Sequence, residues 1–188
     1  MKITFKEFQE EYEWNILKQE DCVKTFDCGD EDLNNFIINE APEFSKALLA
    51  VTYVVKEKLP EEKVIAYFSL AADKLSVTDF NSNSEFNRFR KRRFVYEKRI
   101  KSYPAVKLCR LGVDTSVRKK GLGSIILASI TYSLTHGNKF GCRFLTVDAY
   151  NTAVPFYEKN GFLPLTNKDE NAITRMLYLD LGTIVGTT

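Results

Sequence analysis

The order of apolar and polar positions along the chain predicts a series of strands with helices between them. Stretches rich in β-branched and aromatic residues, several of them alternating with polar residues, indicate the strands. They cover residues near 14–19 and then 48–58, 64–77, 106–114, 144–150, 162–165 and 175–181. The turn Pro60-Glu61-Glu62 is predicted to join the second and third of these strands as a hairpin.

Helix-period patterns lie between the strands. The turn at residues 27–30 caps a first helix, which Pro42 is predicted to interrupt before a short further helical piece. A longer helix is expected over residues 124–136. The positions expected to face the core are Leu33, Phe36 and Ile37 in the first helix and Ile126, Ile130 and Leu134 in the second. Strands that alternate with helices predict an α/β fold, and without a repeat or a low-complexity linker we expect one domain over residues 1–188.

Length and composition fit one folded domain. A chain of 188 residues, 44% of them hydrophobic and including 14 Phe and 9 Tyr, can bury a substantial core. No apolar run approaches the roughly 20 residues that span a membrane. The first residues, Met1 to Phe8, lack the apolar segment of a signal peptide. We therefore expect a cytoplasmic protein without a membrane partner.

The cysteines and the single histidine do not indicate a metal site. Cys22, Cys28, Cys109 and Cys142 lack the paired spacing of metal ligands, so we expect reduced thiols. With only His136 available, a histidine-rich zinc site is excluded. Its place at the end of a predicted helix favours interaction with the helix dipole over a role as a catalytic base.

A glycine-bearing loop follows the predicted strand 106–114. It reads Arg118-Lys119-Lys120-Gly121-Leu122-Gly123, and a helix opens at Ser124. Strand, turn and helix in this order can aim several backbone N–H groups at one point, which suits phosphate oxygens. Glycine helps because it lacks a Cβ and lets a ligand approach the main chain. The pattern is Arg-x-x-Gly-x-Gly and matches neither a P-loop nor the dinucleotide fingerprint.

A second block follows the strand 144–150. It reads Asn151-Thr152-Ala153-Val154-Pro155-Phe156-Tyr157-Glu158-Lys159-Asn160-Gly161-Phe162. Asn151 or Thr152 can cap a helix, Pro155 fits its first turn, and Gly161 can end it in the left-handed conformation.

Together the two blocks, in this order and at this spacing, resemble the GCN5-related N-acetyltransferase (GNAT) superfamily. Arg-x-x-Gly-x-Gly is similar to that family's acetyl-coenzyme A pyrophosphate loop, and Asn-x-Ala-x-x-Phe-Tyr-Glu-x-x-Gly-Phe is similar to its strand-to-helix signature. The resemblance implies an N-acetyltransferase with a mixed central sheet of about six to seven strands, flanked by helices and splayed between strands four and five. The family usually has Ala where Gly112 stands.

The resemblance also implies roles for residues. Backbone N–H groups of the loop bind the pyrophosphate of acetyl-coenzyme A, and the strand ending at Val113 pairs with its pantetheine arm. A main-chain N–H between Leu111 and Val113 stabilises the oxyanion, and Tyr157 protonates the leaving thiolate. The alternative for Tyr157 is a ring that packs the helix on the sheet, and Asn151 either contacts coenzyme A or only caps the helix. The expected cofactor-binding residues are Leu111, Val113, Arg118, Lys119, Lys120, Gly121, Leu122, Gly123, Ser124 and Asn151.

Two further stretches are similar to one branch of that family. They are residues 25–37, which contain Phe-x-Cys-Gly-x-x-x-Leu-Asn-x-Phe-Ile, and residues 103–114. The branch includes bacterial toxins that acetylate the amino group of aminoacyl-tRNA, block translation and are paired with small ribbon-helix-helix antitoxins. The resemblance, over roughly residues 22–181, implies the same amine substrate and such an antitoxin. It also implies a homodimer, because the family often dimerises.

Positive charge is concentrated in residues 87–101. Eight of these residues are basic and one is acidic, whereas the whole chain carries +2. This segment is either a solvated basic helix with an aromatic stripe against the core or an electrostatic footprint for an RNA backbone. The toxin resemblance favours the RNA interpretation, with aromatic residues that anchor the segment or stack on bases. The candidate RNA contacts are Arg88, Arg90, Lys91, Arg92 and Arg93.

The sequence contains no strong candidate for a general base. An α-amine titrates near 8, whereas a lysine side chain titrates at about 10.4, so an aminoacyl ester can lose its proton through water. Asp73, Asp114 and Glu158 are the candidates if a base exists. Two alternatives to a tRNA substrate stay open. One is acetyl transfer to a protein, polyamine or small amine without RNA binding, and the other is a non-catalytic module that holds coenzyme A as a structural ligand.

Overall fold

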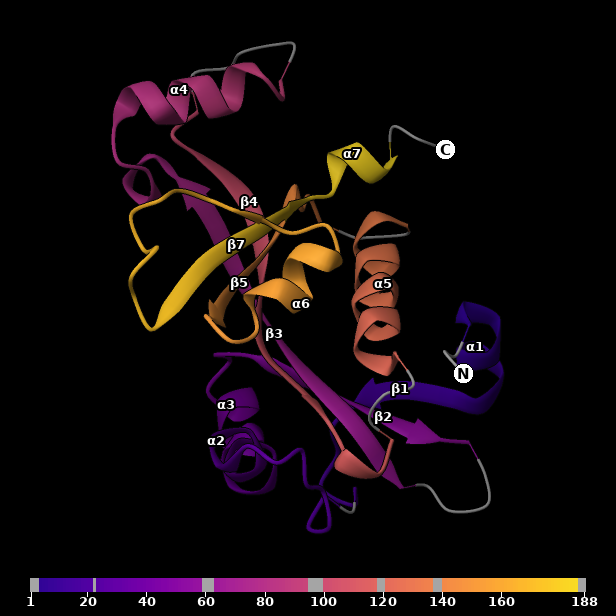
Figure 1. Cartoon of the computed structure of the whole chain (residues 1–188). Coiled ribbons are helices and arrows are strands. Elements are labelled where there is room, and N and C mark those ends of the chain that lie inside the picture. The colour runs from indigo at the N-terminus through magenta and orange to yellow at the C-terminus, as the bar shows by residue number, and fades with distance from the viewer. Residues whose placement is uncertain are drawn as a thin grey trace. The chain divides into compact units, whose positions relative to one another are not determined.

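The computed structural model describes residues 4–21, 23–58, 63–94, 100–117, 121–136 and 140–185 (Figure 1). The strands are β1 (Tyr12–Ile16), β2 (Val51–Glu57), β3 (Val64–Ser76), β4 (Ser102–Val113), β5 (Phe144–Tyr150), β6 (Leu163–Pro164) and β7 (Thr174–Asp180). The α-helices are α1 (Phe5–Glu11), α2 (Glu31–Asn35), α3 (Ala41–Lys46), α4 (Asn83–Lys91), α5 (Leu122–Thr135), α6 (Val154–Lys159) and α7 (Gly182–Val185). The short turns are the π-turn η1 (Phe36–Glu40) and the 3-10 turns η2 (Val77–Asp79) and η3 (Thr115–Val117).

The described strands form a seven-stranded sheet in the order β1-β2-β3-β4-β5-β7-β6. β4 and β5 are parallel, and the pairs β1–β2, β2–β3, β5–β7 and β6–β7 are antiparallel. This mixed sheet with flanking helices confirms the predicted α/β fold. β4 starts at Ser102 rather than at residue 106, and the first strand is displaced toward the N-terminus. The predicted hairpin turn at residues 60–62 lies outside the described residues.

The chain divides into two compact units. One comprises Met1–Ala71 with Leu108–Ile130, and the other comprises Ala72–Lys107 with Thr131–Thr188. Each unit has its own cluster of buried apolar side chains.

In the first unit, α2, η1 and α3 pack on β2 and β3 through aromatic and aliphatic side chains (Figure 1). Phe36, Val54 and Tyr67 are all less than 3% exposed. The Phe26 ring meets Tyr67 edge-on, with 5.3 Å between ring centroids. The Tyr67 hydroxyl donates to the Leu33 carbonyl at 2.7 Å, so its polar atom is satisfied inside the cluster. Burial raises the pKa of Tyr67, which keeps the hydroxyl in its donating form.

The short helical piece predicted around Pro42 is α3, which begins at Ala41, so the break in the helix falls before Pro42 rather than at it. Pro42 lies in the first turn of α3, where a missing N–H removes no helical hydrogen bond. The irregularity lies just before it, in the π-turn η1. The helix α1 is not among the elements predicted above. Its signal was present, because Thr4 and Glu7 form a reciprocal capping box.

Packing in the first unit explains why glycine stands at position 112, where the GNAT family usually has Ala. A Cβ at Gly112 would stand 2.6 Å from Cε1 of Tyr67 and 3.2 Å from Cζ of Phe26. Both rings are buried and in contact with each other, so neither can move without opening the cluster. The close approach of the Tyr67 ring to β4 therefore requires glycine at this position.

We expect Gly112→Ala to lower the free energy of unfolding by about 1–3 kcal/mol, because the added methyl group overpacks a closed aromatic cluster. Gly141→Ala is the matched control, since a Cβ at Gly141 has nothing within 4 Å. Urea unfolding of both variants measures the difference. Equal stabilities of the two variants would contradict the packing explanation.

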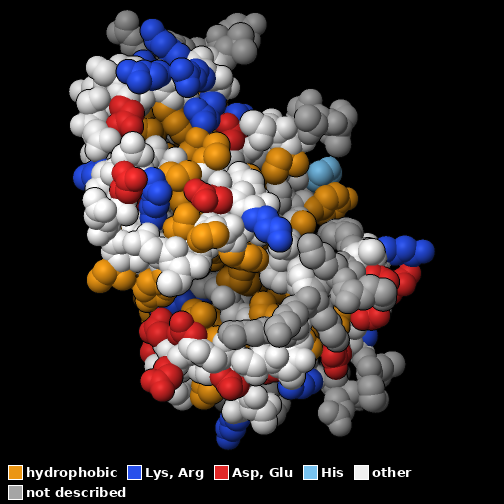
Figure 2. Space-filling model, in the orientation of Figure 1, with side chains coloured by type: hydrophobic (Ala, Val, Ile, Leu, Met, Phe, Trp, Pro, Cys, Tyr) orange, Lys and Arg blue, Asp and Glu red, His pale blue; other side chains and the backbone are white. Residues whose placement is uncertain are grey.

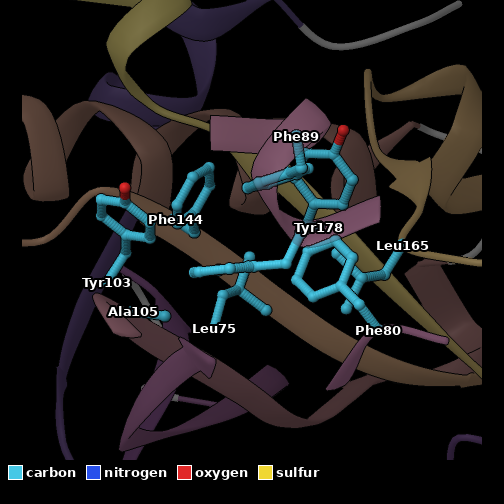
Figure 3. Packing of buried hydrophobic residues seen from close by; sticks show 9 residues of the cluster. Leu75, Phe80, Phe89, Tyr103, Ala105, Phe144, Leu165 and Tyr178 are labelled. Atoms are coloured by element: carbon cyan, nitrogen blue, oxygen red, sulfur yellow. The ribbon is translucent and has the colours of Figure 1, made fainter. Parts of the chain in front are cut away.

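In the second unit, α4 packs on one face of the sheet through aromatic side chains (Figure 3). Phe89 of α4 lies 5.6 Å from Phe144 of β5 and 5.4 Å from Tyr178 of β7, measured between ring centroids. The complete cluster is Leu75, Phe80, Phe86, Phe89, Tyr103, Ala105, Phe144, Leu165 and Tyr178. Each buried aromatic ring contributes roughly 1.5–3 kcal/mol of hydrophobic stabilisation, so this cluster fixes α4 to the sheet.

Candidate functional site

The start of α5 carries the backbone N–H groups of a first helical turn. Gly121 has φ +77°, in the left-handed region that favours glycine, and Leu122 is 3% exposed. The amides of Ser124 and Ile125 donate to the Gly121 carbonyl at 3.1 and 3.3 Å. The amides of Leu122 and Gly123 belong to the first helical turn, where the helix offers no acceptor, and the helix dipole adds positive potential. These two amides fit a phosphate oxygen, whereas Ser124 has only its hydroxyl to offer.

The remaining predicted residues around this loop are only partly described. Arg118, Lys119 and Lys120 lie outside the described residues. Leu111 and Val113 are half-buried at the end of β4, with Gly112 buried between them. The structure thus places the strand end and the helix start as the sequence predicted, in the first unit.

Asp114 anchors the end of β4. It is 3% exposed and accepts hydrogen bonds from the amides of Asp27 (3.2 Å) and Ser116 (2.9 Å) and from the Ser116 hydroxyl. Lys63 lies 3.7 Å away. Burial acts to raise the pKa of Asp114, but these hydrogen bonds and Lys63 outweigh it and lower the pKa. Of the three carboxylates considered as bases, this one is held in a structural network.

Tyr157 lies in the second unit, in the middle of α6. It is 8% exposed, and its ring makes edge-on contacts with Phe156 (5.1 Å) and Phe162 (5.4 Å). No described residue hydrogen-bonds to its hydroxyl. Burial raises the pKa of Tyr157 to about 12, so the phenol is protonated throughout the neutral range. The side chain therefore combines a packed ring with a hydroxyl that holds a proton.

The turn between β5 and α6 is held by Asn151, which does not cap the helix. Its side-chain amide donates to the Ala172 carbonyl at 2.5 Å, and its backbone amide donates to the Ile173 carbonyl at 3.3 Å. The N-cap of α6 is Ala153, without a side-chain hydrogen bond. The capping alternative for Asn151 is therefore wrong. Pro155 lies in the first turn and Gly161 has φ +87°, as the sequence predicted.

The predicted RNA-contact residues do not share one environment. Arg88, Lys91 and Arg92 are exposed at the C-terminal end of α4, where Lys and Arg side chains gather in Figure 2. Arg90 is half-buried, with its guanidinium 5.9 Å from the centroid of the Phe86 ring. We refer to Arg88, Lys91 and Arg92 as the basic cluster.

Arg93 belongs to a structural network. Its Nε lies 3.1 Å from Asp180 Oδ2, its guanidinium is 3.9 Å from the Phe89 ring centroid, and it donates to the Tyr178 hydroxyl. Arg143 pairs with the other oxygen of Asp180, with 2.8 Å between Nε and Oδ1. The Asp180 side chain is only 8% exposed. One buried carboxylate thus bridges two arginines and ties the end of α4 to β5 and β7.

Sequence reasoning missed Asp180. It ends a strand as an ordinary acidic residue would, and its two partners are far away in sequence. Sequence motifs report residues that are close along the chain, so they cannot predict a carboxylate that pairs with two distant arginines.

We expect Asp180→Asn to lower the free energy of unfolding by about 2–4 kcal/mol, because two guanidinium groups lose their charge partner. The figure is below that of a fully buried pair because the arginine side chains are 19% and 28% exposed. Glu43→Gln removes the exposed Lys46–Glu43 pair, with side chains 73% and 69% exposed, and should change stability by less than about 0.5 kcal/mol. Urea unfolding compares the two, and a similar small effect from both would refute the bridge.

Other candidate groups can be placed briefly. His136 follows the end of α5, and its ring stacks on Tyr132 at 4.2 Å between centroids. Glu158 is exposed on α6. Cys28, Cys109 and Cys142 are not in disulfides, and Cys22 lies outside the described residues. Among the described residues no group of three His, Cys, Asp or Glu side chains could hold a metal ion, and no helix is long and apolar enough to span a membrane.

A cavity of about 470 Å³ lies in the first unit. Leu17, Asp21, Ile37, Pro42 and Thr52 are among its lining residues. None of the predicted site residues lines it, so it does not bear on the chemistry considered above.

Comparison with known proteins identifies the class. Residues 93–178 match the family model of the acetyltransferase (GNAT) domain. A tyrosine-to-phenylalanine variant of KacT has a similar structure, with 19% sequence identity, a TM-score of 0.75, and coverage of 95% of this chain and 99% of that chain. AtaT complexed with acetyl-methionyl-tRNAfMet is 25% identical, with a TM-score of 0.74 over 93% of this chain and 97% of that chain. AtaTR bound with AcCoA is 24% identical, with a TM-score of 0.74 over 93% and 96%.

Residues 93–178 thus match the acetyltransferase (GNAT) domain, and the fold of the chain is similar to that of KacT and AtaT. The predicted enzyme class, an N-acetyltransferase, agrees with the acetyltransferase family match, and the similar structure of AtaTR has AcCoA bound. The roles of individual residues and the identity of the acceptor are separate questions.

Proposed function

We propose that this acetyltransferase transfers acetyl to the α-amine of aminoacyl-tRNA and thereby inhibits translation. The observation that carries the proposal is the basic cluster, three exposed cations on one helix end of a chain whose net charge is only +2. Such a cluster suits the phosphates of a nucleic acid backbone. The similarity to AtaT complexed with acetyl-methionyl-tRNAfMet supports the same substrate class.

The start of α5 would hold the cofactor. Acetyl-coenzyme A supplies an acetyl group activated as a thioester. The amides of Leu122 and Gly123 would donate to its pyrophosphate, with the α5 dipole behind them. Arg118, Lys119, Lys120, Gly121 and the Ser124 hydroxyl complete the proposed phosphate site. Leu111 and Val113 would pair with the pantetheine arm through their main chains, and Asn151 would contact coenzyme A from the β5–α6 turn.

Tyr157 would be the proton donor. A phenol with a pKa of about 12 does not ionise at neutral pH, so its proton is always available. Such a weak acid gives up its proton only to a strong base. A thiolate that forms in a buried, poorly solvated site is a stronger base than one in water, which favours the transfer at the moment the sulfur leaves.

Every bond and proton in the proposed acetyl transfer can be accounted for. The amine nitrogen forms a bond to the acetyl carbonyl carbon, and the carbon–sulfur bond breaks. A main-chain N–H between Leu111 and Val113 stabilises the charge on the carbonyl oxygen. The sulfur takes the Tyr157 proton, the nitrogen loses one proton to solvent, and Tyr157 regains a proton from solvent.

We expect Tyr157→Phe to lower kcat for acetyl transfer by about 10²- to 10⁴-fold, because the variant keeps the packed ring and loses only the proton. Tyr132→Phe is the matched control, since Tyr132 is 55% exposed on α5. Transfer of radiolabelled acetyl to a total charged tRNA pool measures both variants. If Tyr157→Phe retained the wild-type rate, the ring would be only a packing element.

We expect the triple variant Arg88→Gln, Lys91→Gln, Arg92→Gln to bind tRNA more weakly. The slope of log affinity against log salt should become shallower by about 0.9 for each phosphate that the variant no longer neutralises. The control variant carries Lys18→Gln, Lys46→Gln and Lys168→Gln, which remove the same charge from exposed lysines elsewhere. Arg93 is left intact in both, because it supports the fold. Equal affinity of the two triple variants for tRNA would contradict the RNA interpretation of the basic cluster.

The acceptor pool distinguishes the remaining functions. Label on charged tRNA, but not on uncharged tRNA, supports the proposal and identifies the amino acid by fractionation. Label only on protein, spermidine or another small amine would make this an acetyltransferase without an RNA substrate. No transfer to any amine would leave a module that binds coenzyme A structurally.

The proposal extends to partners and context. Structures of the AtaT toxin with the C-terminus of the antitoxin AtaR and of KacTA with DNA support an antitoxin partner here. We propose a small ribbon-helix-helix antitoxin, a homodimeric enzyme and a cytoplasmic location, where charged tRNA is found. Because the KacT and AtaT structures match 93–95% of this chain, we also propose that residues 1–188 form a single GNAT domain.

A further inference from the structure

The parallel pairing between β4 and β5 ends early. Its register covers Ala105 with Phe144, Val106 with Leu145, and Lys107 with Thr146. Both strands continue beyond this point, β4 to Val113 and β5 to Tyr150. Thr146 is therefore the last β5 residue in the pairing with β4.

A carboxylate from β3 reaches this end point. The Thr146 hydroxyl, which is fully buried, donates to Asp73 Oδ2 at 2.5 Å. Side chains alternate between the faces of a strand, so Asp73 shares a face with Leu75, and Thr146 shares that face with Phe144. Leu75, Ala105 and Phe144 of the aromatic cluster form that layer in Figure 3. Asp73 and Thr146 therefore lie on the same face of the sheet as the aromatic cluster of the second unit, next to its edge.

Among the described residues, the Asp73 carboxylate meets one hydrogen-bond donor, the Thr146 hydroxyl. Thr146 occupies one oxygen, and no described Lys or Arg forms an ion pair with Asp73. The neighbouring cation on this face, Lys107, is paired with Asp148 of β5. A half-buried carboxylate without a cation gains strongly from a positively charged hydrogen-bond donor. The chemical group that an acetyltransferase must bring to this place, an amine, is such a donor.

We propose that Asp73 is the residue that binds the acceptor amine, through its oxygen opposite Thr146, and that Thr146 is the positioning residue that fixes the carboxylate. The inference rests on the proposed function only in that the acceptor is an amine. It requires no tRNA. Asp73 accepts a hydrogen bond from the amine nitrogen and orients it. An acceptor that binds as an ammonium first releases one proton to solvent, and the neutral amine then reacts as described above.

Asp73→Asn tests the contact with little change of shape. The Asn carbonyl oxygen can still accept from Thr146, which turns the amide NH₂ group toward the amine and replaces attraction with repulsion. We expect kcat/KM for the amine to fall by about tenfold to hundredfold, mainly through a higher acceptor KM, with the KM for acetyl-coenzyme A unchanged. Glu43→Gln is the control, because it makes the same change to an exposed carboxylate that is paired with Lys46 and lies in the first unit.

The Thr146 variants give a second, independent readout. Thr146→Val keeps the shape and removes the donor, so we expect the acceptor KM to rise by about twofold to tenfold. Thr146→Ser restores the hydroxyl and should restore the KM. This comparison decides the matter if Asp73→Asn does not fold, as judged by thermal unfolding.

The acceptors used are a charged tRNA pool, spermidine and a peptide with a free N-terminus. If the wild-type enzyme labels no charged tRNA, the proposed substrate fails, and the variants are compared on spermidine or the peptide. A change in acceptor KM specific to Asp73→Asn supports the assignment. An unchanged acceptor KM, or an equal rise in Glu43→Gln, overturns it.

Discussion

The short parallel pairing of β4 with β5 is the constraint on which the rest of the arrangement depends. Parallel neighbours cannot be joined by a tight turn, so the chain must cross over, and α5 is that crossover. The glycine loop therefore follows the end of β4, and the segment carrying Asn151 and Tyr157 follows the end of β5. In α/β sheets such segments after the carboxyl ends of strands are where ligands bind. The early end of the pairing also leaves Thr146 and Asp73 at its margin.

Charge along the sequence and charge on the surface differ in the basic segment. The arginines and lysines look alike as a run of cations, yet Arg93 is paired with Asp180 while Arg88, Lys91 and Arg92 face outward. The reason is geometric. Phe86 and Phe89 direct one side of α4 into the aromatic cluster, and an arginine that follows on the same side meets β7. An arginine can serve there because its planar guanidinium stacks on a ring and pairs with a carboxylate at once.

The sequence predicted an element correctly where the residues that form it are neighbours along the chain. The apolar run of β5, the glycine at position 161 and the proline at position 155 act through neighbours along the chain, and each lies where expected. Predictions failed where a distant group or an irregular turn decided. Asn151 donates to Ala172 rather than to its own helix, and Pro42 is accommodated because a π-turn precedes it. Gly112 follows the same logic, since the ring that excludes a Cβ comes from β3.

The sequence by itself indicated the class of this protein through a family resemblance. The phosphate loop and the tyrosine-bearing helix that carry it are contiguous motifs, so they can be recognised without a structure. The sequence also determined that the chain folds as alternating strands and helices. Only the tertiary structure decided which arginine supports the fold, which carboxylates lie in networks of several donors and which one meets a single hydroxyl donor. Asp114, Asp180 and Asp73 are indistinguishable as letters, and they differ only in the donors that other parts of the fold bring to their oxygens.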